Sequence, residues 1–247
     1  MARAAVRRRL AWQVSRAGDI TDETARVRTI TLGVPDWPGH RAGQHLDIRL
    51  TAEDGYQAER EYSIASAPAE PVAITVERLE DGEVSPYLTQ DLQPGDQMEV
   101  RGPIGGYFVW EPGDGGPLML IAGGSGIVPL RSILRHRQLT GSAVPARLLY
   151  SSRTLPDVIY SSELSQQPDG VQVICTLTRE QPPGWTGHSG RIDADLLMKA
   201  AWPAVENPLA YVCGPTSFAE AAAAGLVGLG YPPDRVKTER FGTTGGR

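Results

Sequence analysis

Three residues near position 60 of this 247-residue sequence have types and spacing that suit a phosphorylated ligand. Arg60, Tyr62 and Ser63 stand at positions i, i+2 and i+3 of a segment that we expect to be a strand. Arginine pairs with phosphate, an aromatic ring stacks on a flat ligand, and a hydroxyl hydrogen-bonds to a heteroatom. The same residue types are also common on strands that bind no ligand, so this segment alone is weak evidence for a binding site.

A second segment joins an apolar run to a glycine-rich turn. Leu118–Ala122 is followed by Gly123–Gly126 (Gly-Gly-Ser-Gly), and helical spacing begins at Ile127. A strand, a glycine-rich turn and a helix N-terminus together form a pyrophosphate site, because backbone N–H groups and the helix dipole face the anion. The turn is neither G-x-G-x-x-G nor a P-loop. Spacing alone therefore leaves a nucleotide site and an ordinary tight turn equally open.

Two further segments lie near the C-terminus. Val212–Pro215 (Val-Cys-Gly-Pro) ends an apolar run and precedes a helical pattern, and ligands of open parallel sheets bind where strands end. Cys213 is therefore either beside a ligand or a small buried apolar residue. The segment 238–242 is uninformative in isolation.

The elements that must position these residues differ between the two halves of the chain. From about Trp12 to Val109, apolar and polar residues alternate, as in Gln44–Leu50 and Val72–Arg78. Half-buried strands separated by turn residues indicate an antiparallel barrel or sandwich. A short helix is expected around Ser85–Leu92.

After residues 111–117, continuous apolar runs alternate with helical stretches, which indicates a parallel sheet with βαβ connections. The expected strands are Leu118–Ala122, Arg147–Tyr150, Val171–Thr176 and Leu209–Cys213. Ser217 and Glu220 are spaced as a capping box for a last helix that ends at Gly230. We place the domain boundary near residue 112, which gives domains 1–112 and 113–247.

Taken in order and with their gaps, the motifs resemble the ferredoxin–NADP reductase superfamily over residues 12–242. The matches to the family patterns R-x-Y-S, G-x-[VL]-S, G-P-x-G, G-G-x-G-I-x-P, C-G-P and E-x-F are Arg60–Ser63, Gly82–Ser85, Gly102–Gly105, Gly123–Pro129, Cys213–Pro215 and Glu239–Phe241. The resemblance implies an N-terminal antiparallel Greek-key β-barrel that binds FAD. It also implies a C-terminal α/β domain with a doubly wound parallel sheet that binds NAD(P).

The resemblance also implies a role for each matching residue. Flavin contacts are expected from Arg60, Tyr62, Ser63, Ile64, Gly82, Val84, Ser85 and Phe241. Contacts with the nicotinamide nucleotide are expected from Gly124, Ser125, Gly126, Ser152, Arg153, Arg179, Arg191, Cys213, Gly214 and Pro215. Ser63 near flavin N5, Cys213 against the nicotinamide and Glu239 as a proton relay are the expected catalytic residues. Hydride transfer belongs to the cofactors, so no metal ion is expected.

The identity of each cofactor is a separate question. Ser152 and Arg153 follow the second parallel strand, where an acidic residue would bind a ribose diol and a basic one suits a 2′-phosphate. We therefore expect NADPH to be preferred over NADH, although Arg153 also occurs in relatives that use NADH. FAD is expected rather than FMN, because relatives with FMN are commonly fused to an iron–sulfur domain.

Composition excludes several function classes. The two cysteines, Cys175 and Cys213, are too few for an iron–sulfur cluster, so we expect the one-electron relay on another chain. The net charge of −5, with four arginines in the first nine residues, argues against a general nucleic-acid binder. The sequence contains neither a signal-peptide pattern nor an apolar run long enough to span a membrane, so we expect a cytoplasmic protein.

The resemblance implies a flavoprotein oxidoreductase that takes hydride from NADPH onto FAD. It would pass electrons to a separate carrier, such as ferredoxin or a flavodoxin, that serves an oxygenase. A reductase of free flavin or other small oxidants, and a non-catalytic flavin-binding subunit of a larger complex, remain alternatives. Arg131, Arg135 and Arg137, on the helix after the glycine turn, either dock an acidic carrier or form a solvated face.

Overall fold

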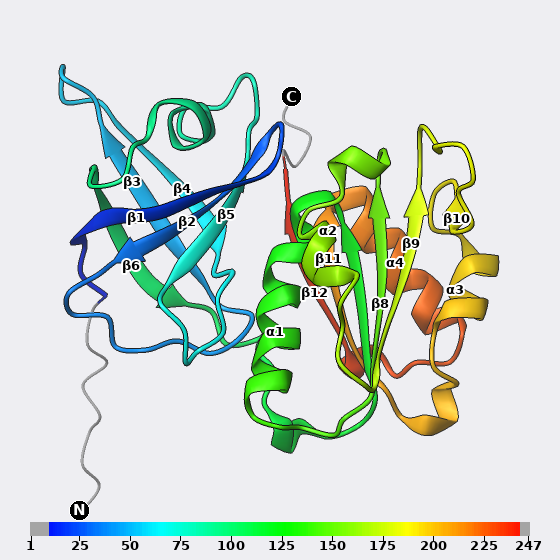
Figure 1. The fold of residues 1–247 in the computed structure, drawn as a ribbon. Helices are drawn as coiled ribbons and strands as arrows, with labels where there is room; N and C mark the ends of the chain where they lie inside the picture. The colour runs from blue at the N-terminus through cyan, green and yellow to red at the C-terminus, as the bar shows by residue number, and fades with distance from the viewer. Residues whose placement is uncertain (1–9, 243–247) are drawn as a thin grey trace, which may run out of the picture.

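The structure is a computed structural model that describes residues 10–242. It contains two six-stranded sheets that lie side by side, with one helix, α1 (Ile127–Leu139), between them (Figure 1). The strands of the first sheet are β1 (Gln13–Thr24), β2 (Val27–Gly33), β3 (His45–Thr51), β4 (Gln57–Ser63), β5 (Ala73–Glu77) and β6 (Gln97–Ile104).

The first sheet is antiparallel and closes into a barrel. Its strand order is β4-β3-β6-β1-β2-β5, and a bridge between Ile64 and Ile74 joins the two edge strands. Period-two alternation turns Leu46 and Ile48 of β3 inward, where both are fully buried. The antiparallel fold predicted for this half of the chain is confirmed.

The short helix expected around 85–92 is present as a single π-helical turn over Tyr87–Asp91. Val84, Leu88 and Leu92 flank or lie in this turn, are at most 1% exposed and belong to the apolar core of the barrel. Their burial anchors the preceding glycine turn to the barrel.

The second sheet is parallel throughout, as predicted. Its order is β10-β9-β8-β7-β11-β12, with strands β7 (Leu118–Gly123), β8 (Ala146–Ser152), β9 (Val171–Leu177), β10 (His188–Ser189), β11 (Leu209–Pro215) and β12 (Val236–Phe241). Helices α1 and α2 (Ser161–Leu164) pack on one face of this sheet, and α3 (Ala194–Ala200) and α4 (Thr216–Gly228) pack on the other. The strand order reverses between β7 and β11, which makes their carboxyl ends the switch point of a doubly wound sheet.

The capping box predicted at the start of α4 is wrong. The helix begins at Thr216, directly after Pro215, and no side chain caps it. Ser217 therefore occupies the second helical position, from which its hydroxyl is badly placed to cap the first turn. The predicted end of the helix is confirmed, because Gly230 has a φ of +93°, the left-handed conformation that glycine adopts readily.

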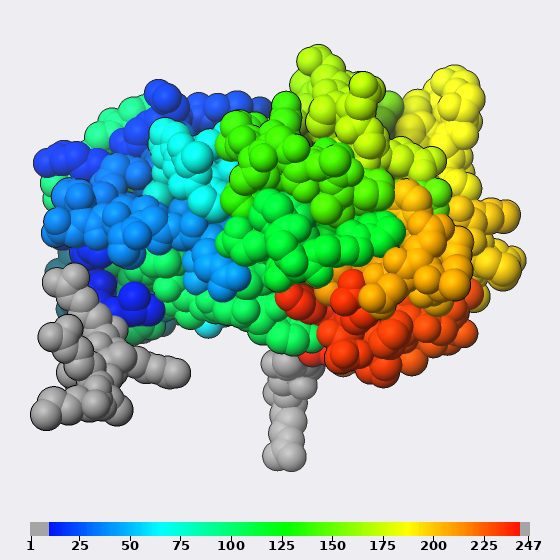
Figure 2. Space-filling model, turned by 90° about the horizontal axis from the view of Figure 1, so that it is seen from below, coloured from blue at the N-terminus to red at the C-terminus, as the bar shows by residue number. Residues whose placement is uncertain are grey.

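Helix α1 joins the two domains. Arg131 donates to the carbonyl of Ala65 (3.0 Å), and the Ser132 hydroxyl donates to the carbonyl of Ser66 (2.7 Å). Arg135 forms an ion pair with Glu70 of the barrel. The space-filling view from below shows the two halves in contact along a continuous boundary (Figure 2).

These contacts correct the expectation for the arginines of α1. Arg131 and Arg135 hold the domain interface together, and Arg137 is only 4% exposed and donates to the carbonyl of Val144. The cluster is therefore neither a docking surface nor a solvated face. Among residues 10–242, no helix is both long and apolar enough to cross a membrane.

Candidate functional site

A cleft of about 680 Å³ lies between the barrel and the parallel sheet. Its walls come from β4, β5 and the Gly82–Ser85 turn, which precedes the π-helical turn, on the barrel side. On the other side they come from the carboxyl ends of β7, β8 and β11 and from the end of β12. The volume falls in the range of sites that take cofactors and other small molecules.

Arg60 and Tyr62 of β4 bring a cation and an aromatic ring to the barrel side of the cleft. The guanidinium of Arg60, half exposed, forms an ion pair with Glu83. Burial raises the pKa of Tyr62, so its hydroxyl stays neutral and the ring presents an uncharged face. These two side chains fit the phosphate and the flat ring system of a flavin nucleotide.

The turn at Gly82–Ser85 supports the same wall. The Ser85 hydroxyl accepts a hydrogen bond from the backbone N–H of Leu79 (3.0 Å) and so closes the turn. A Cβ on Gly82 would lie 2.8 Å from that hydroxyl and 3.0 Å from the Leu79 carbonyl oxygen. A side chain at position 82 would therefore have to displace these groups, so glycine suits this tight turn, and Gly82 itself lines the cleft.

The glycine turn of the parallel sheet forms the opposite wall. Gly124 has a φ of +55°, and a Cβ on Gly126 would lie 2.1 Å from the carbonyl oxygen of Cys213. Only glycine lets the turn pack this closely against the end of β11. The Ser125 hydroxyl faces the barrel and donates to Glu77 (2.7 Å).

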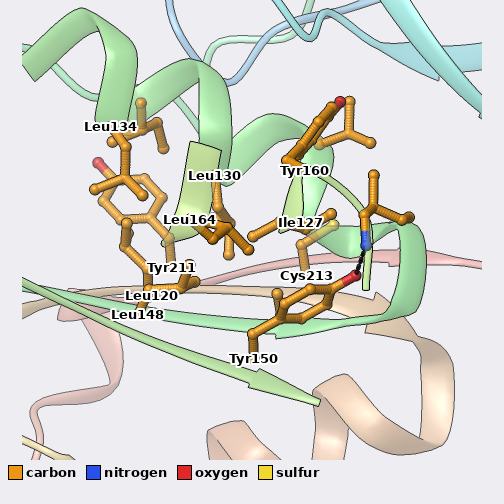
Figure 3. Packing of buried hydrophobic residues seen from close by; sticks show 14 of the residues in the cluster. Leu120, Ile127, Leu130, Leu134, Leu148, Tyr150, Tyr160, Leu164, Tyr211 and Cys213 are labelled. Atoms are coloured by element: carbon orange, nitrogen blue, oxygen red, sulfur yellow. Dashed lines mark hydrogen bonds between the residues drawn. The ribbon is translucent and has the colours of Figure 1, made fainter. Parts of the chain in front are cut away.

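An apolar cluster holds this turn in place. Ile127, Leu130 and Leu134 of α1 pack onto side chains of the sheet, among them Leu120 and Leu148 (Figure 3). The Tyr150 hydroxyl accepts a hydrogen bond from the backbone N–H of Ile159 at 3.3 Å, which is the dashed line in Figure 3. The N-terminus of α1 is thus fixed relative to the ends of β7 and β8.

Cys213 and Glu239 lie opposite each other on β11 and β12, just behind the cleft wall. The Cys213 sulfur is 4.0 Å from Oε2 of Glu239, and His45 Nδ1 is 3.9 Å from Oε1. Burial, with a smaller contribution from the charge of Glu61, raises the pKa of Glu239 to about 7. Burial likewise raises the pKa of the Cys213 thiol well above its ordinary value. Glu239 can therefore gain or lose a proton near neutral pH beside a neutral thiol.

The structure brings most residues expected from the sequence to one place. The cleft wall contains Arg60, Tyr62, Ser63, Gly82, Val84, Ser85, Gly124, Ser125, Ser152, Arg153, Pro215 and Phe241. Behind this wall lie Ile64, Gly126, Cys213, Gly214 and Glu239. Arg179 and Arg191 are exposed and stand outside the wall, because Arg179 lies beyond the end of β9 and Arg191 follows the edge strand β10.

Several residues of the cleft were missed by the sequence reasoning. Thr75 and Glu77 of β5 face the cleft, and its other lining residues include Glu61, Leu79, Glu83, Val128, Ser151, Thr178 and Phe218. Alternation along β5 does place Thr75 and Glu77 on the face opposite Ile74 and Val76. That pattern identifies an outward face of the barrel but contains no sign that a second domain covers it.

One group of potential metal ligands occurs among residues 10–242. Atoms of His45, Asp47 and Glu61 lie within 4.8 Å of one another. Arg101 donates two hydrogen bonds to Asp47, at 2.8 and 2.6 Å, so the charge of this carboxylate is already balanced by a cation.

Comparison with known proteins agrees with this architecture. Residues 13–109 match the family described as oxidoreductase FAD-binding domain, and residues 120–224 match the oxidoreductase NAD-binding domain. Ferredoxin–NADP reductase B of Sorangium cellulosum is 34% identical over 212 residues, which cover 81% of this chain and 84% of that protein. The glycine betaine monooxygenase reductase subunit of Chromohalobacter salexigens is 32% identical over 91% of this chain.

The structural comparison extends to both domains. The FAD/NAD-binding domain of nitric oxide dioxygenase from Vibrio cholerae superposes with a TM-score of 0.82 at 25% identity, covering 94% of this chain and 99% of that one. Fold, cleft and domain matches together define an oxidoreductase with one domain for FAD and one for NAD(P). The chain belongs to the ferredoxin–NADP reductase family. It spans 63% of the length of the Chromohalobacter reductase subunit.

Proposed function

We propose that this protein takes hydride from NADPH onto FAD and passes the electrons to a separate one-electron carrier, such as ferredoxin or a flavodoxin, that serves an oxygenase. The observation that carries this proposal is the cleft between the domains, whose walls combine the Arg60–Ser63 strand with Gly123–Ser125 of the glycine turn. Because each domain contributes one wall, a flavin on the barrel and a nicotinamide on the sheet would meet in that cleft.

The residues of the barrel wall suit FAD. Arg60 supplies a cation for its pyrophosphate, Tyr62 supplies a stacking surface, and the open turn at Gly82–Ser85 supplies backbone groups. Phe241, 36% exposed at the end of β12, is placed to cover a ring from the other side. Bound FAD would supply the two-electron to one-electron conversion that the amino acids cannot perform.

A preference for NADPH is supported by the end of β8. Ser152 and Arg153 line the cleft there, and Arg153 is exposed. The acidic side chains of the described cleft wall, Glu61, Glu77 and Glu83, all come from the barrel instead. A basic side chain at this strand end favours a 2′-phosphate over a ribose diol.

The acceptor is inferred from the names of relatives. Two of them are reductase components of monooxygenases, namely the Chromohalobacter protein and the 3-ketosteroid-9-alpha-monooxygenase reductase of Mycobacterium tuberculosis, which is 31% identical over 90% of this chain. The Sorangium relative is a ferredoxin–NADP reductase. The two cysteines of this sequence cannot hold a four-cysteine cluster, which supports a carrier outside these 247 residues.

Anaerobic titration of the flavin-loaded protein tests the proposal. NADPH is expected to bleach the flavin absorbance, and steady-state turnover with an artificial one-electron acceptor is expected to give NADPH a kcat/KM at least tenfold above that of NADH. Arg153→Ala is expected to remove most of this preference, since it takes away the cation for the 2′-phosphate, while kcat/KM for NADH serves as the internal control. Equal kcat/KM values for the two nucleotides would disprove the NADPH preference, and a flavin that neither nucleotide reduces would disprove the reductase activity.

A further inference from the structure

A carboxylate of the barrel occupies the front of the glycine turn. Glu77 ends β5, and its Oε2 accepts a hydrogen bond from the Ser125 hydroxyl at 2.7 Å. A Cβ placed on Gly124 would lie 3.9 Å from the same oxygen. The negative charge of Glu77 therefore stands directly at the turn to which we assign the pyrophosphate of the nicotinamide nucleotide.

The charge environment of the glycine turn favours a carboxylate beside it. Helix α1 has thirteen residues, no side-chain cap and no acidic residue in its first turn. The partial positive charge of such an N-terminus attracts an anion, and the Glu77 carboxylate lies beside the turn that precedes this helix. In contrast to Glu83, which pairs with Arg60, and Glu70, which pairs with Arg135, Glu77 is bonded to a neutral hydroxyl.

We propose that Glu77 is an internal competitor of the nucleotide pyrophosphate, which must displace this carboxylate to reach the turn. The contact also ties the two domains across the cleft while the turn is free of nucleotide. Glu77 therefore weakens the binding of oxidised and reduced nucleotide alike and favours their release after hydride transfer. This inference rests on the proposed function, because it takes the Gly123–Gly126 turn as the pyrophosphate site.

The expected effect follows from charge alone. A pyrophosphate oxygen within reach of Ser125 would stand a few ångströms from the Glu77 carboxylate. At that separation two negative charges near a protein surface repel strongly enough to lower affinity by about tenfold. NADP⁺ and NAD⁺ share the pyrophosphate, so the two nucleotides are affected equally. This separates the role of Glu77 from that of Arg153, which acts on the 2′-phosphate.

Glu77→Gln in the flavin-loaded protein tests the proposal, since glutamine keeps the size and can still accept from Ser125. The dissociation constants of NADP⁺ and NAD⁺ are measured by calorimetry at low and high salt. Both are expected to fall about tenfold at low salt, and the gain is expected to shrink at 1 M salt, where the repulsion in the wild-type protein is screened. Stopped-flow measurement is expected to show slower release of NADP⁺.

Glu80→Gln is the matched control, because it removes a charge from an exposed side chain three residues further along, outside the cleft wall. It is expected to leave both constants within twofold of the wild-type values. Unchanged or weaker nucleotide binding by Glu77→Gln would overturn the proposal. Flavin reduction by NADPH is scored separately in the wild-type protein, so failure of the reductase function and failure of the Glu77 competitor are distinguishable.

Discussion

At the scale of single residues, Glu239 is a partly buried carboxyl group that titrates near neutral pH. Its pKa is raised to about 7 because the carboxyl is buried and lies near the charge of Glu61. Between its ordinary value of 4.5 and about 7, the folded protein keeps a proton that the unfolded chain has released. The free energy of unfolding therefore falls as pH rises through this window and stays low above it.

Glu239→Gln removes that dependence. We expect the variant to have a higher Tm than the wild-type protein at pH 8 and a similar Tm at pH 5. The gain in free energy of unfolding is at most about 3.5 kcal/mol, because each unit of the pKa shift from 4.5 to about 7 corresponds to about 1.4 kcal/mol. Thermal unfolding from pH 5 to pH 8 checks this, with the exposed Glu220→Gln as control. A difference in Tm that does not change with pH would contradict the prediction.

Gly126 is a second residue whose role follows from one contact. A Cβ there would lie 2.1 Å from the Cys213 carbonyl oxygen and 2.5 Å from its carbon, so Gly126→Ala must push the turn away from β11. We expect a loss of about 1–3 kcal/mol in the free energy of unfolding and nucleotide binding weakened at least tenfold, with FAD retained. Calorimetry and flavin absorbance measure these quantities.

Gly113→Ala is the control for Gly126→Ala. A Cβ on Gly113 would have nothing within 4 Å, and its backbone φ is not positive. The stability and nucleotide affinity of this variant are expected to match the wild-type protein. Wild-type nucleotide affinity in Gly126→Ala would show that the close contact with β11 does not position the turn.

At the scale of elements, β5 and the segment before α2 are joined across the domain interface. Tyr160 is 3% exposed, has a φ of 60° and hydrogen-bonds through its hydroxyl to Thr75 of β5. The guanidinium carbon of Arg131 lies 4.4 Å from the centroid of its ring. Thr75 and Glu77 point to the same side of β5, so this single strand contacts the nucleotide domain at two places along the cleft.

Tyr160→Phe isolates the hydroxyl of this contact, since phenylalanine keeps the ring beneath Arg131. We expect a loss of about 1–2 kcal/mol in the free energy of unfolding, because a buried hydrogen bond disappears. Tyr107→Phe is the control: this ring is 61% exposed and its hydroxyl makes one bond of 3.4 Å to Val236. Denaturant titration of both variants measures the difference, and equal losses would show that burial at the interface adds nothing.

The elements also show which features a sequence reveals. Alternation along 44–50 and 72–78 predicts β3 and β5, and continuous apolar runs predict β7 and β11, because each pattern reports the local division between core and exterior. Glycine positions are equally readable, since a positive φ or a close approach leaves few other choices. These local signals are enough to predict both sheets and most residues of the cleft wall.

Features that depend on the docking of one domain onto the other were not predictable. Arg131 and Arg135 have the spacing of an exposed helix face, and Glu77 has that of an exposed strand face. Each is partly covered by the opposite domain, and helical or strand periodicity contains no information about such a partner. The same reasoning explains why the arginines of α1 were misread and why Glu77 was missed.

At the scale of the whole molecule, the ion pairs of α1 link the barrel to the nucleotide domain. Arg135 bonds both Glu70 of the barrel and Glu163 of α2, and Arg131 bonds Glu163 (2.8 Å) and the carbonyl of Ala65. Burial alone would raise the pKa of Glu70, yet the hydrogen bonds from Arg135 and from the Ala67 backbone lower it overall. The hydrogen bonds from Arg135 and Ala67, together with the charges of Arg135 and Arg131, therefore outweigh the effect of burial on the pKa of this carboxyl.

Arg135→Ala breaks this link and leaves Glu70 partly buried without its cation. The barrel and the nucleotide domain should then stabilise each other less. We expect the wild-type protein to unfold in one calorimetric transition and Arg135→Ala to unfold in two, with the domain of lower stability unfolding at least several degrees earlier. In a double-mutant cycle with Glu70→Ala, a coupling energy of about 1–3 kcal/mol is expected for a pair buried to this degree.

Arg16→Ala is the matched control. Among the described residues, the Arg16 side chain donates only to the Gly95 carbonyl within the barrel, so this variant should still unfold in one transition. One cooperative transition in Arg135→Ala, with a coupling energy near zero, would mean that apolar contacts under α1 alone hold the two domains together.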